Sequence, residues 1–123
     1  MMWLKRDIKK EDAVRLLRRA FAKIVIAERL LYDKRLRTQL VVTTALAGVP
    51  LSGDFFSGLY CADAFSDIKK AIKVLNKLAP RSSEIERAKL EGAREVLEKA
   101  HKRMHPSRLK SIITEALAIL EEF

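Results

Sequence analysis

The chain is poor in the residues that interrupt helices and in those that form cross-links. Its 123 residues include three prolines, four glycines and a single cysteine, Cys61. A lone cysteine cannot form an internal disulfide, so the sequence predicts a reduced, intracellular protein. The N-terminal stretch MMWLKRDIKK lacks the apolar segment of a secretory signal, and we therefore expect a cytoplasmic location.

Side-chain amides are almost absent, because Gln39 and Asn76 are the only two in the chain. Few amides beside abundant Lys, Arg and Glu are typical of proteins adapted to heat. The sequence therefore predicts a thermophile-like protein, in which many charged side chains stabilise the fold and need not bind a ligand.

Positive charge is in excess and is unevenly distributed. The chain has 25 basic and 16 acidic side chains, a net charge of +9, whereas no Lys or Arg occurs from Thr38 to Ile68. Residues 1–37 hold 12 basic and 5 acidic groups, which gives 12 − 5 = +7 for this third of the chain. Such a basic segment favours an anionic partner, and nucleic acid is the first to consider.

Hydrophobic periodicity predicts an all-α protein, a bundle of four to five helices in a single domain over residues 1–123. The first helical segment runs from about Lys9 to Ala47. As one helix it would be about 60 Å long, too long for a compact domain of this size, so we expect a break or kink near Tyr32–Asp33. The apolar arc of this segment consists of Val14, Leu17, Ala20, Phe21, Ile24, Val25, Leu31 and Tyr32.

Capping residues and prolines predict where the following helices begin and end. The second long helix is expected to start with Asp54 as its N-cap and to stop before Pro80. Ser83 and Glu86 fit a capping box, which predicts the start of the next helix.

That helix is expected to continue to Met104, with Ile85 facing the core. Pro106 then interrupts the chain, and Ser107 is the predicted cap of the last helix. The apolar stripe of the last helix extends to Phe123.

The stretch 38–65 is the least charged part of the chain. Pro50, Asp54 and Asp63 exclude a membrane span, the loop GVPLSG lacks the pattern of a phosphate-binding loop, and the helix after it offers no side chain to read bases. Four apolar residues here lie off the core stripe of their helix and predict an interface: Phe55, Phe56, Leu59 and Ala62. We expect these four residues to be covered either by a second copy of the chain in a homodimer or by residues 38–49 of the same chain.

A row of basic residues on the first helical segment is the strongest indication of function. They share one arc, opposite the apolar one: Arg15, Arg18, Arg19, Lys23, Arg29 and Arg37. Phosphate contacts need positive charge spread along a face and little else. The same row is also compatible with a solvated helix surface that has no ligand.

Two further groups of residues bear on chemistry. Glu98, His101 and His105 have a spacing that can hold a divalent metal on one helix face, but only one such motif is present and no metal or other cofactor is predicted. Glu28 lies within the apolar arc of the first helix. A carboxylate there is either a functional acid or base, or the partner of a Lys or Arg on a neighbouring helix, which is the interpretation we favour.

Arg94 and His101 are separated by six residues. This spacing resembles the R-x4–6-H motif of the HEPN family, small all-α dimeric proteins that include metal-independent ribonucleases. The resemblance covers eight residues and the fold class, and Glu95 follows the Arg where the family often has Asn, Asp or His. It implies that His101 acts as a general base and that Arg94 stabilises charge on the phosphorane.

The sequence thus leads to three hypotheses of function. The first is a non-enzymatic accessory or structural protein that binds RNA or DNA through phosphates, as a homodimer or in a larger assembly. The second is a protein–protein assembly module that uses the charge-poor 38–65 surface. The third is a HEPN-like ribonuclease.

Overall fold

The computed structural model describes residues 8–121 and confirms the predicted all-α bundle. Within these residues every regular element is a helix, and no strand occurs. The α-helices are α1 (Lys10–Tyr32), α2 (Lys34–Leu46), α3 (Gly53–Leu78), α4 (Glu84–Leu97) and α5 (Pro106–Glu121), with a short 3-10 helix at Ala79–Arg81 after α3.

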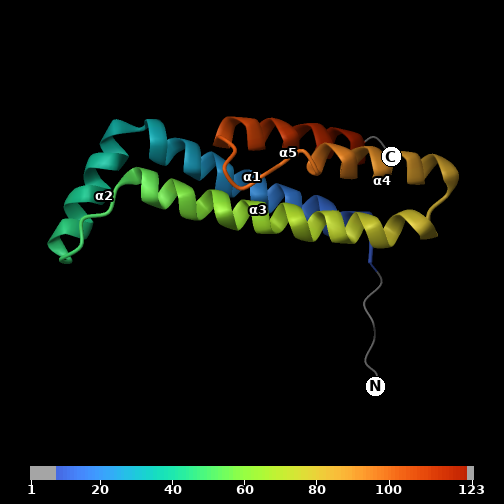
Figure 1. The fold of residues 1–123 in the computed structure, drawn as a ribbon, viewed down its shortest axis with the longest axis horizontal. Coiled ribbons are helices and arrows are strands. Elements are labelled where there is room, and N and C mark those ends of the chain that lie inside the picture. The colour runs from blue at the N-terminus through green and yellow to red at the C-terminus, as the bar shows by residue number, and fades with distance from the viewer. Residues whose placement is uncertain (1–7, 122–123) are drawn as a thin grey trace, which may run out of the picture.

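Four of the helices run alternately up and down, and the fifth leaves the bundle. The long helices α1 and α3 lie side by side and antiparallel, with α4 and α5 packed along them, as Figure 1 shows. Helix α1 contacts both α3 and α5, and α4 contacts α5 and α3. Helix α2 extends away from one end of this bundle.

The α1–α3 contact follows a seven-residue repeat of small and large side chains. The buried small residues recur every seven positions: Ala13, Ala20 and Ala27 on α1, and Ser57, Ala64 and Ala71 on α3. The larger buried residues between them are Leu17 and Ile24 on α1, and Cys61, Ile68 and Leu75 on α3. This repeat is the one that keeps the seam of a coiled coil facing its partner, and the small residues let the two backbones approach closely.

The break between α1 and α2 occurs where it was predicted. Asp33 has φ −85° and ψ 100°, an extended conformation that ends α1 at Tyr32. Its carboxylate accepts a hydrogen bond from the backbone N–H of Leu36 at 3.1 Å, which caps α2. Arg37 donates to the carbonyl of Leu31 at 2.8 Å and so satisfies one of the free carbonyls at the end of α1.

Two of the three predicted caps differ in the structure. Ser52, and not Asp54, caps α3, because its hydroxyl accepts a hydrogen bond from the N–H of Phe55 at 3.2 Å. Ser83 caps α4 as predicted, by accepting from the N–H of Glu86 at 3.3 Å.

The cap of α5 is a histidine. Nδ1 of His105 accepts a hydrogen bond from the backbone N–H of Ser107 at 3.1 Å, and Pro106 is the first residue of the helix. The prediction that Ser107 is the cap was wrong, because proline needs no hydrogen-bond acceptor and fits the first helical position.

Helix α4 is shorter than predicted and ends at Leu97 rather than Met104. The chain turns after Glu98, which lets Ala100 and Met104 pack half-buried against the core from a loop. Ile85 is 76% exposed, since it lies in the first turn of α4 off the arc of the buried residues. Tyr32 is 65% exposed at the end of α1, and Phe123 lies outside the described residues.

Helix α2 and the return segment 47–52 form a protrusion that we call the arm. None of the 13 residues of α2 is buried, and Leu46 near its tip is 85% exposed. The hydroxyl of Thr44 bonds to the carbonyl of Leu40 and accepts from the N–H of Leu51, which holds the return segment against the helix. Among residues 8–121, no helix is long and apolar enough to cross a bilayer.

Candidate anion-binding surface

All six basic residues predicted to bind phosphate have a carboxylate partner in the fold. Four of them make ion pairs at the surface: Arg15–Asp12 at 2.8 Å, Arg18–Glu121 at 2.7 Å, Arg29–Asp33 at 4.0 Å and Arg37–Asp54 at 3.6 Å. Exposed pairs of this kind contribute little to stability, about 0–1 kcal/mol, and leave the cation accessible to other anions.

The other two, Arg19 and Lys23, converge on a buried carboxylate of α3. Asp67 is 2% exposed at its side chain and accepts hydrogen bonds from both nitrogens of the Arg19 fork, at 2.8 and 3.3 Å, and from Lys23 at 2.8 Å. Lys23 also pairs with Asp63 at 2.9 Å. Burial alone would raise the pKa of Asp67, but the hydrogen bonds from Arg19 and Lys23 outweigh burial and lower it.

Arg19 and Lys23 therefore stabilise the α1–α3 contact. Burial opposes the charge on Lys23, yet the hydrogen bonds to Asp67 and Asp63 raise its pKa, so it stays a cation. A phosphate that drew either residue away would remove one of the two cations that compensate the buried charge of Asp67, which is costly. These two residues are the least suited of the six to bind a ligand.

A second basic row, which the sequence reasoning did not single out, lies on the last turns of α3 and in the 3-10 helix after it. The α3 cationic row consists of Lys69, Lys70, Lys73, Lys77 and Arg81. All five side chains are exposed, and within residues 8–121 none of them pairs with a carboxylate. The row spans about 18 Å of helix, which matches the axial rise of roughly five phosphates of one strand. The signal in the sequence is the absence of any acid from Ile68 to Ser83.

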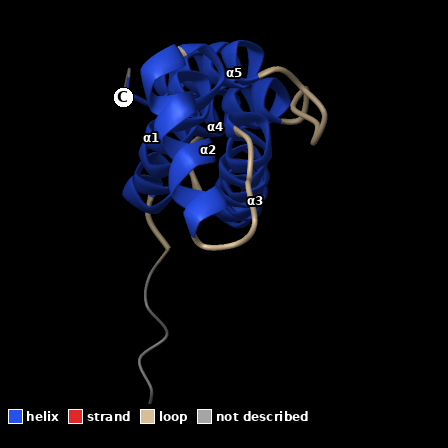
Figure 2. Ribbon diagram, turned by 90° about the vertical axis from the view of Figure 1, so that its left-hand side faces the viewer, coloured by secondary structure: helices blue, strands red, loops and turns tan. Residues whose placement is uncertain are grey.

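The segment between α4 and α5 is a second run of positive charge in the chain. No acidic residue occurs from Lys99 to Thr114. The loop covers a hollow of about 500 Å³, which we call the loop hollow, lined by Lys99, His101, Met104, Arg108, Ser111 and Ile112. Figure 2 shows the bundle from the end where α2 lies, with α3 and the loop that projects beside α5 on the same side of the picture.

Glu28 has the structural partner that we favoured for it. Its carboxylate pairs with Lys110 of α5 at 2.7 Å and accepts a hydrogen bond from the hydroxyl of Ser107 at 3.0 Å. The hydrogen bond from Lys110 is the main cause of its lowered pKa, and burial opposes that shift. Glu28 thus ties α1 to α5.

The metal-binding arrangement suggested by the spacing of Glu98, His101 and His105 does not form, because α4 ends before these residues. Nδ1 of His105 caps α5, and its Nε2 lies 2.6 Å from the hydroxyl of Tyr32. Within the part of the chain that the structure describes, no cluster of three or more His, Cys, Asp or Glu side chains is placed to hold a metal ion.

Arg94 and His101 lie on different parts of the fold and have different neighbours. Arg94 donates to the side chain of Asn76 at 3.2 Å and lies 3.5 Å from Glu98. His101 lies in the loop beyond the end of α4, where it lines the loop hollow. The arrangement that HEPN-like cleavage requires, with the two residues meeting across a dimer, stays a prediction.

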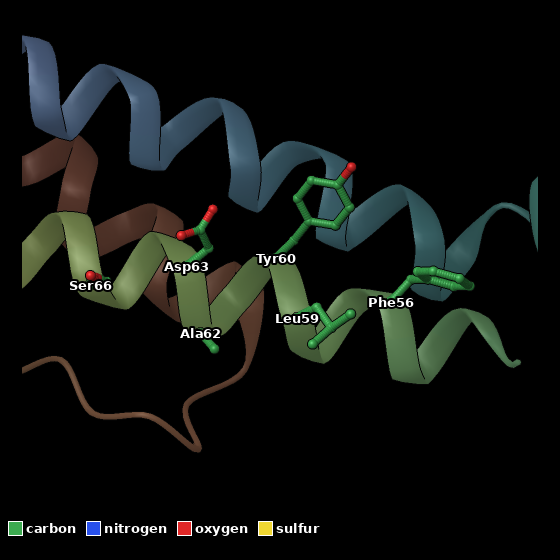
Figure 3. Close-up of a pocket in the computed structure, with 6 residues that line it drawn as sticks. All are labelled: Phe56, Leu59, Tyr60, Ala62, Asp63 and Ser66. Atoms are coloured by element: carbon green, nitrogen blue, oxygen red, sulfur yellow. The ribbon is translucent and has the colours of Figure 1, made fainter.

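Three of the four predicted interface residues are exposed in the single chain, and Phe56 is half-buried. Phe55 and Leu59 are 48% and 53% exposed, so residues 38–49 do not cover them and the intramolecular alternative was wrong. A shallow hollow of about 570 Å³ adjoins them on α3, lined by Phe56, Leu59, Tyr60, Ala62, Asp63 and Ser66. Figure 3 shows Tyr60 and Asp63 on the side toward α1, whereas Leu59 and Ala62 point away from it.

No known protein family, curated protein or solved structure matches this chain. The class to which it belongs is therefore defined by its geometry alone. Residues 8–121 form an all-α bundle with a basic row on α3 that has no carboxylate partner among these residues, and with an exposed arm in which residues 38–52 carry no charge.

Proposed function

We propose that the protein is a non-enzymatic accessory or structural protein that binds nucleic acid through phosphates. We assign the contact to the α3 cationic row and the α4–α5 loop rather than to the basic row of α1. The observation that supports this choice is the pairing of charges. Each basic residue of the α1 row has a carboxylate partner, whereas the five of the α3 row have none within residues 8–121.

A phosphate that binds an α1 arginine competes with a nearby carboxylate for that cation, whereas one that binds Lys70 or Lys73 displaces only water and counterions. Counterion release is the main sequence-independent source of affinity for nucleic acid. The unpaired row should therefore give the larger share of the binding free energy.

Two matched triple variants test this assignment. Lys70, Lys73 and Lys77 are changed to Gln in one, and three exposed arginines of α1, namely Arg15, Arg18 and Arg29, are changed to Gln in the other. Both variants lose three positive charges, so any difference between them reflects position and not net charge. Binding of fluorescein-labelled RNA and DNA is measured by anisotropy over a series of salt concentrations, and circular dichroism confirms that both variants fold.

The wild-type protein should show a linear fall of log affinity with log salt. The α3 variant should reduce the slope by about 3, one unit for each lost phosphate contact, and the α1 variant by less than 1. The reverse order would assign the contact to α1. Flat anisotropy for the wild-type protein at low salt would rule out phosphate binding altogether.

A second function, protein–protein assembly, is supported by a separate observation. The arm has no buried residue in α2, and it adjoins the exposed Phe55 and Leu59 at the start of α3. Residues 38–53 carry no charge, so two copies of this cationic protein can approach here with little repulsion. We propose a homodimer or larger assembly through this surface.

Sedimentation of the protein over a range of concentrations tests the assembly. Leu46→Lys and Phe55→Lys should each shift the protein toward the monomer, because each places a charge within an apolar contact. A wild-type protein that remains monomeric at the highest concentration would rule out self-assembly.

The HEPN-like alternative is tested on the RNA recovered from the binding assays, which is run on a gel. Cleavage of that RNA by the wild-type protein, abolished by Arg94→Ala or His101→Ala, would establish this alternative.

A further inference from the structure

The loop hollow combines the two kinds of surface that a single nucleotide needs. Lys99, His101 and Arg108 supply positive charge or hydrogen-bond donors, whereas Met104 and Ile112 supply an apolar wall. Ser111 adds a hydroxyl from α5. No carboxylate lines the hollow, and neither Lys99 nor Arg108 pairs with a carboxylate within residues 8–121.

The dimensions of the hollow suit one base with its phosphate. Its volume of about 500 Å³ lies within the range of pockets that hold small ligands. A base can pack its face against the Met104 thioether and the Ile112 side chain, or stack on the His101 ring. Its phosphate then lies at the cationic rim of Lys99 and Arg108.

The lining of the hollow favours a nucleic-acid strand over an acidic peptide. A nucleotide offers both a phosphate for the cationic rim and a flat base for the apolar wall of Met104 and Ile112. A peptide carboxylate would use the cationic rim, but it would leave the apolar wall without a partner.

We propose that the loop hollow takes up an unpaired base, so that the protein prefers single-stranded nucleic acid to a duplex. The inference rests on the proposed phosphate binding and adds a selectivity to it. A base in a duplex is paired and stacked, and it enters such a pocket only if it is first flipped out, at a cost of a few kcal/mol. The strand thus gains a contact that the duplex lacks, while both share the phosphate contacts of α3.

A pair of matched substitutions on α5 isolates the hollow. Ser111 lines the loop hollow, whereas Thr114 lies one turn away and lines a different depression. Both are exposed, and the hydroxyl of each donates to a carbonyl of its own helix, Ser111 at 3.2 Å and Thr114 at 2.8 Å. Ser111→Leu fills the hollow without changing charge, and Thr114→Leu makes a similar change outside it.

Anisotropy is measured with one labelled oligonucleotide as a single strand, as a duplex, and as a strand of the same length with abasic residues. The wild-type protein should bind the single strand about tenfold more tightly than the duplex or the abasic strand. Ser111→Leu should remove most of this preference and leave duplex affinity within twofold. Thr114→Leu should change neither.

Each contrary result has a distinct meaning. If the duplex binds with a salt slope that depends on α3, but Ser111→Leu behaves like Thr114→Leu, the hollow does not hold a base and the proposed function stands. If the abasic strand binds as tightly as the intact strand, or if a poly-glutamate peptide of equal charge competes equally, the hollow recognises charge alone and the inference is wrong. If none of the nucleic acids binds, the proposed function itself fails.

Discussion

Asp67 is a buried carboxylate with two cationic partners, and replacing both partners should reveal the free-energy cost of burying its charge. The change is Arg19→Met together with Lys23→Met, which keeps apolar stems over the α1–α3 seam and removes both cations. Asp67, 2% exposed at its side chain, would then have no positive partner. Breaking a buried ion pair by removing one side costs about 3–5 kcal/mol.

Protonation sets an upper limit to this cost. Asp67 can become neutral at pH 7, and raising the pKa of a carboxyl from 3.8 to 7 corresponds to roughly 4 kcal/mol at about 1.36 kcal/mol per pKa unit. We therefore expect the double variant to lose about 3–4 kcal/mol of unfolding free energy at pH 7. A triple variant with Asp67→Leu in addition should regain most of the loss, because an apolar group replaces the stranded charge.

The loss should depend on pH with a definite sign. In the wild-type protein the pKa of Asp67 is lowered, so its stabilising effect is complete above the unfolded pKa of about 4 and is lost as the pH falls through the folded pKa. In the double variant the pKa is raised, so protonation relieves the penalty in acid. The stability gap between the two proteins should thus be largest near pH 7, narrow as the pH falls toward 4 and Asp67 of the double variant becomes protonated, and narrow further below that.

Urea unfolding followed by circular dichroism at 222 nm, at pH 7 and at pH 4, measures these free energies. A gap below about 1 kcal/mol at pH 7, or a gap that does not narrow in acid, would refute the view that Asp67 is a buried charge held by its two partners. A triple variant as unstable as the double one would show that lost packing, and not charge, is the cause.

Three further changes have expected outcomes in the same unfolding assay or in a simple reaction. Gly92→Ala should stabilise the protein by about 0.5–1 kcal/mol, because α4 has open space for a methyl group there. Gly53→Ala should destabilise the protein, because its Cβ would collide with a backbone carbonyl of α1. Equal effects of the two substitutions would refute the close approach of the backbones at Gly53. His105→Ala should lower the free energy of unfolding by about 1 kcal/mol because it removes the cap of α5, and His105→Asp should restore most of this loss. If the alanine variant is as stable as the wild-type protein, the cap contributes nothing. Cys61 should react with a thiol reagent only when the protein unfolds, because burial blocks access to the thiol and raises its pKa, so little reactive thiolate forms. Rapid reaction of the native protein would contradict this burial of Cys61.

The fold class and the break at Asp33 were predictable because they depend on local signals. Helical periodicity, scarce glycine and proline, and a capping aspartate are all visible within a few residues of sequence. The early end of α4 was not predictable in this way, because it depends on Ala100 and Met104 packing against the core from a loop. The histidine cap of α5 was missed because histidine is not among the usual capping residues.

The candidate site shows the limit of reading charge from sequence. Five of the six cations of the predicted row lie on α1 and Arg37 lies on α2, and their carboxylate partners come mostly from other segments. Asp67 is 48 residues from Arg19, and Glu121 is 103 residues from Arg18. A helical wheel cannot show such long-range pairing. Runs without any acid, such as 68–83 and 99–114, are a better guide, because they also lack local partners that would neutralise them.

The seven-residue repeat along α1 and α3 has a consequence for how the two helices find their alignment. Because alanine recurs every seven positions on both helices, sliding α3 by seven residues, about 10 Å, would again bring alanine layers to the seam. Apolar packing alone would therefore discriminate weakly between such registers. Asp67 would then face the α1 positions seven residues away from Arg19 and Lys23, which are Asp12 and Leu16 on one side and Ile26 and Leu30 on the other. None of these four residues is a cation, so the buried ion pair selects one register from those that the repeat allows.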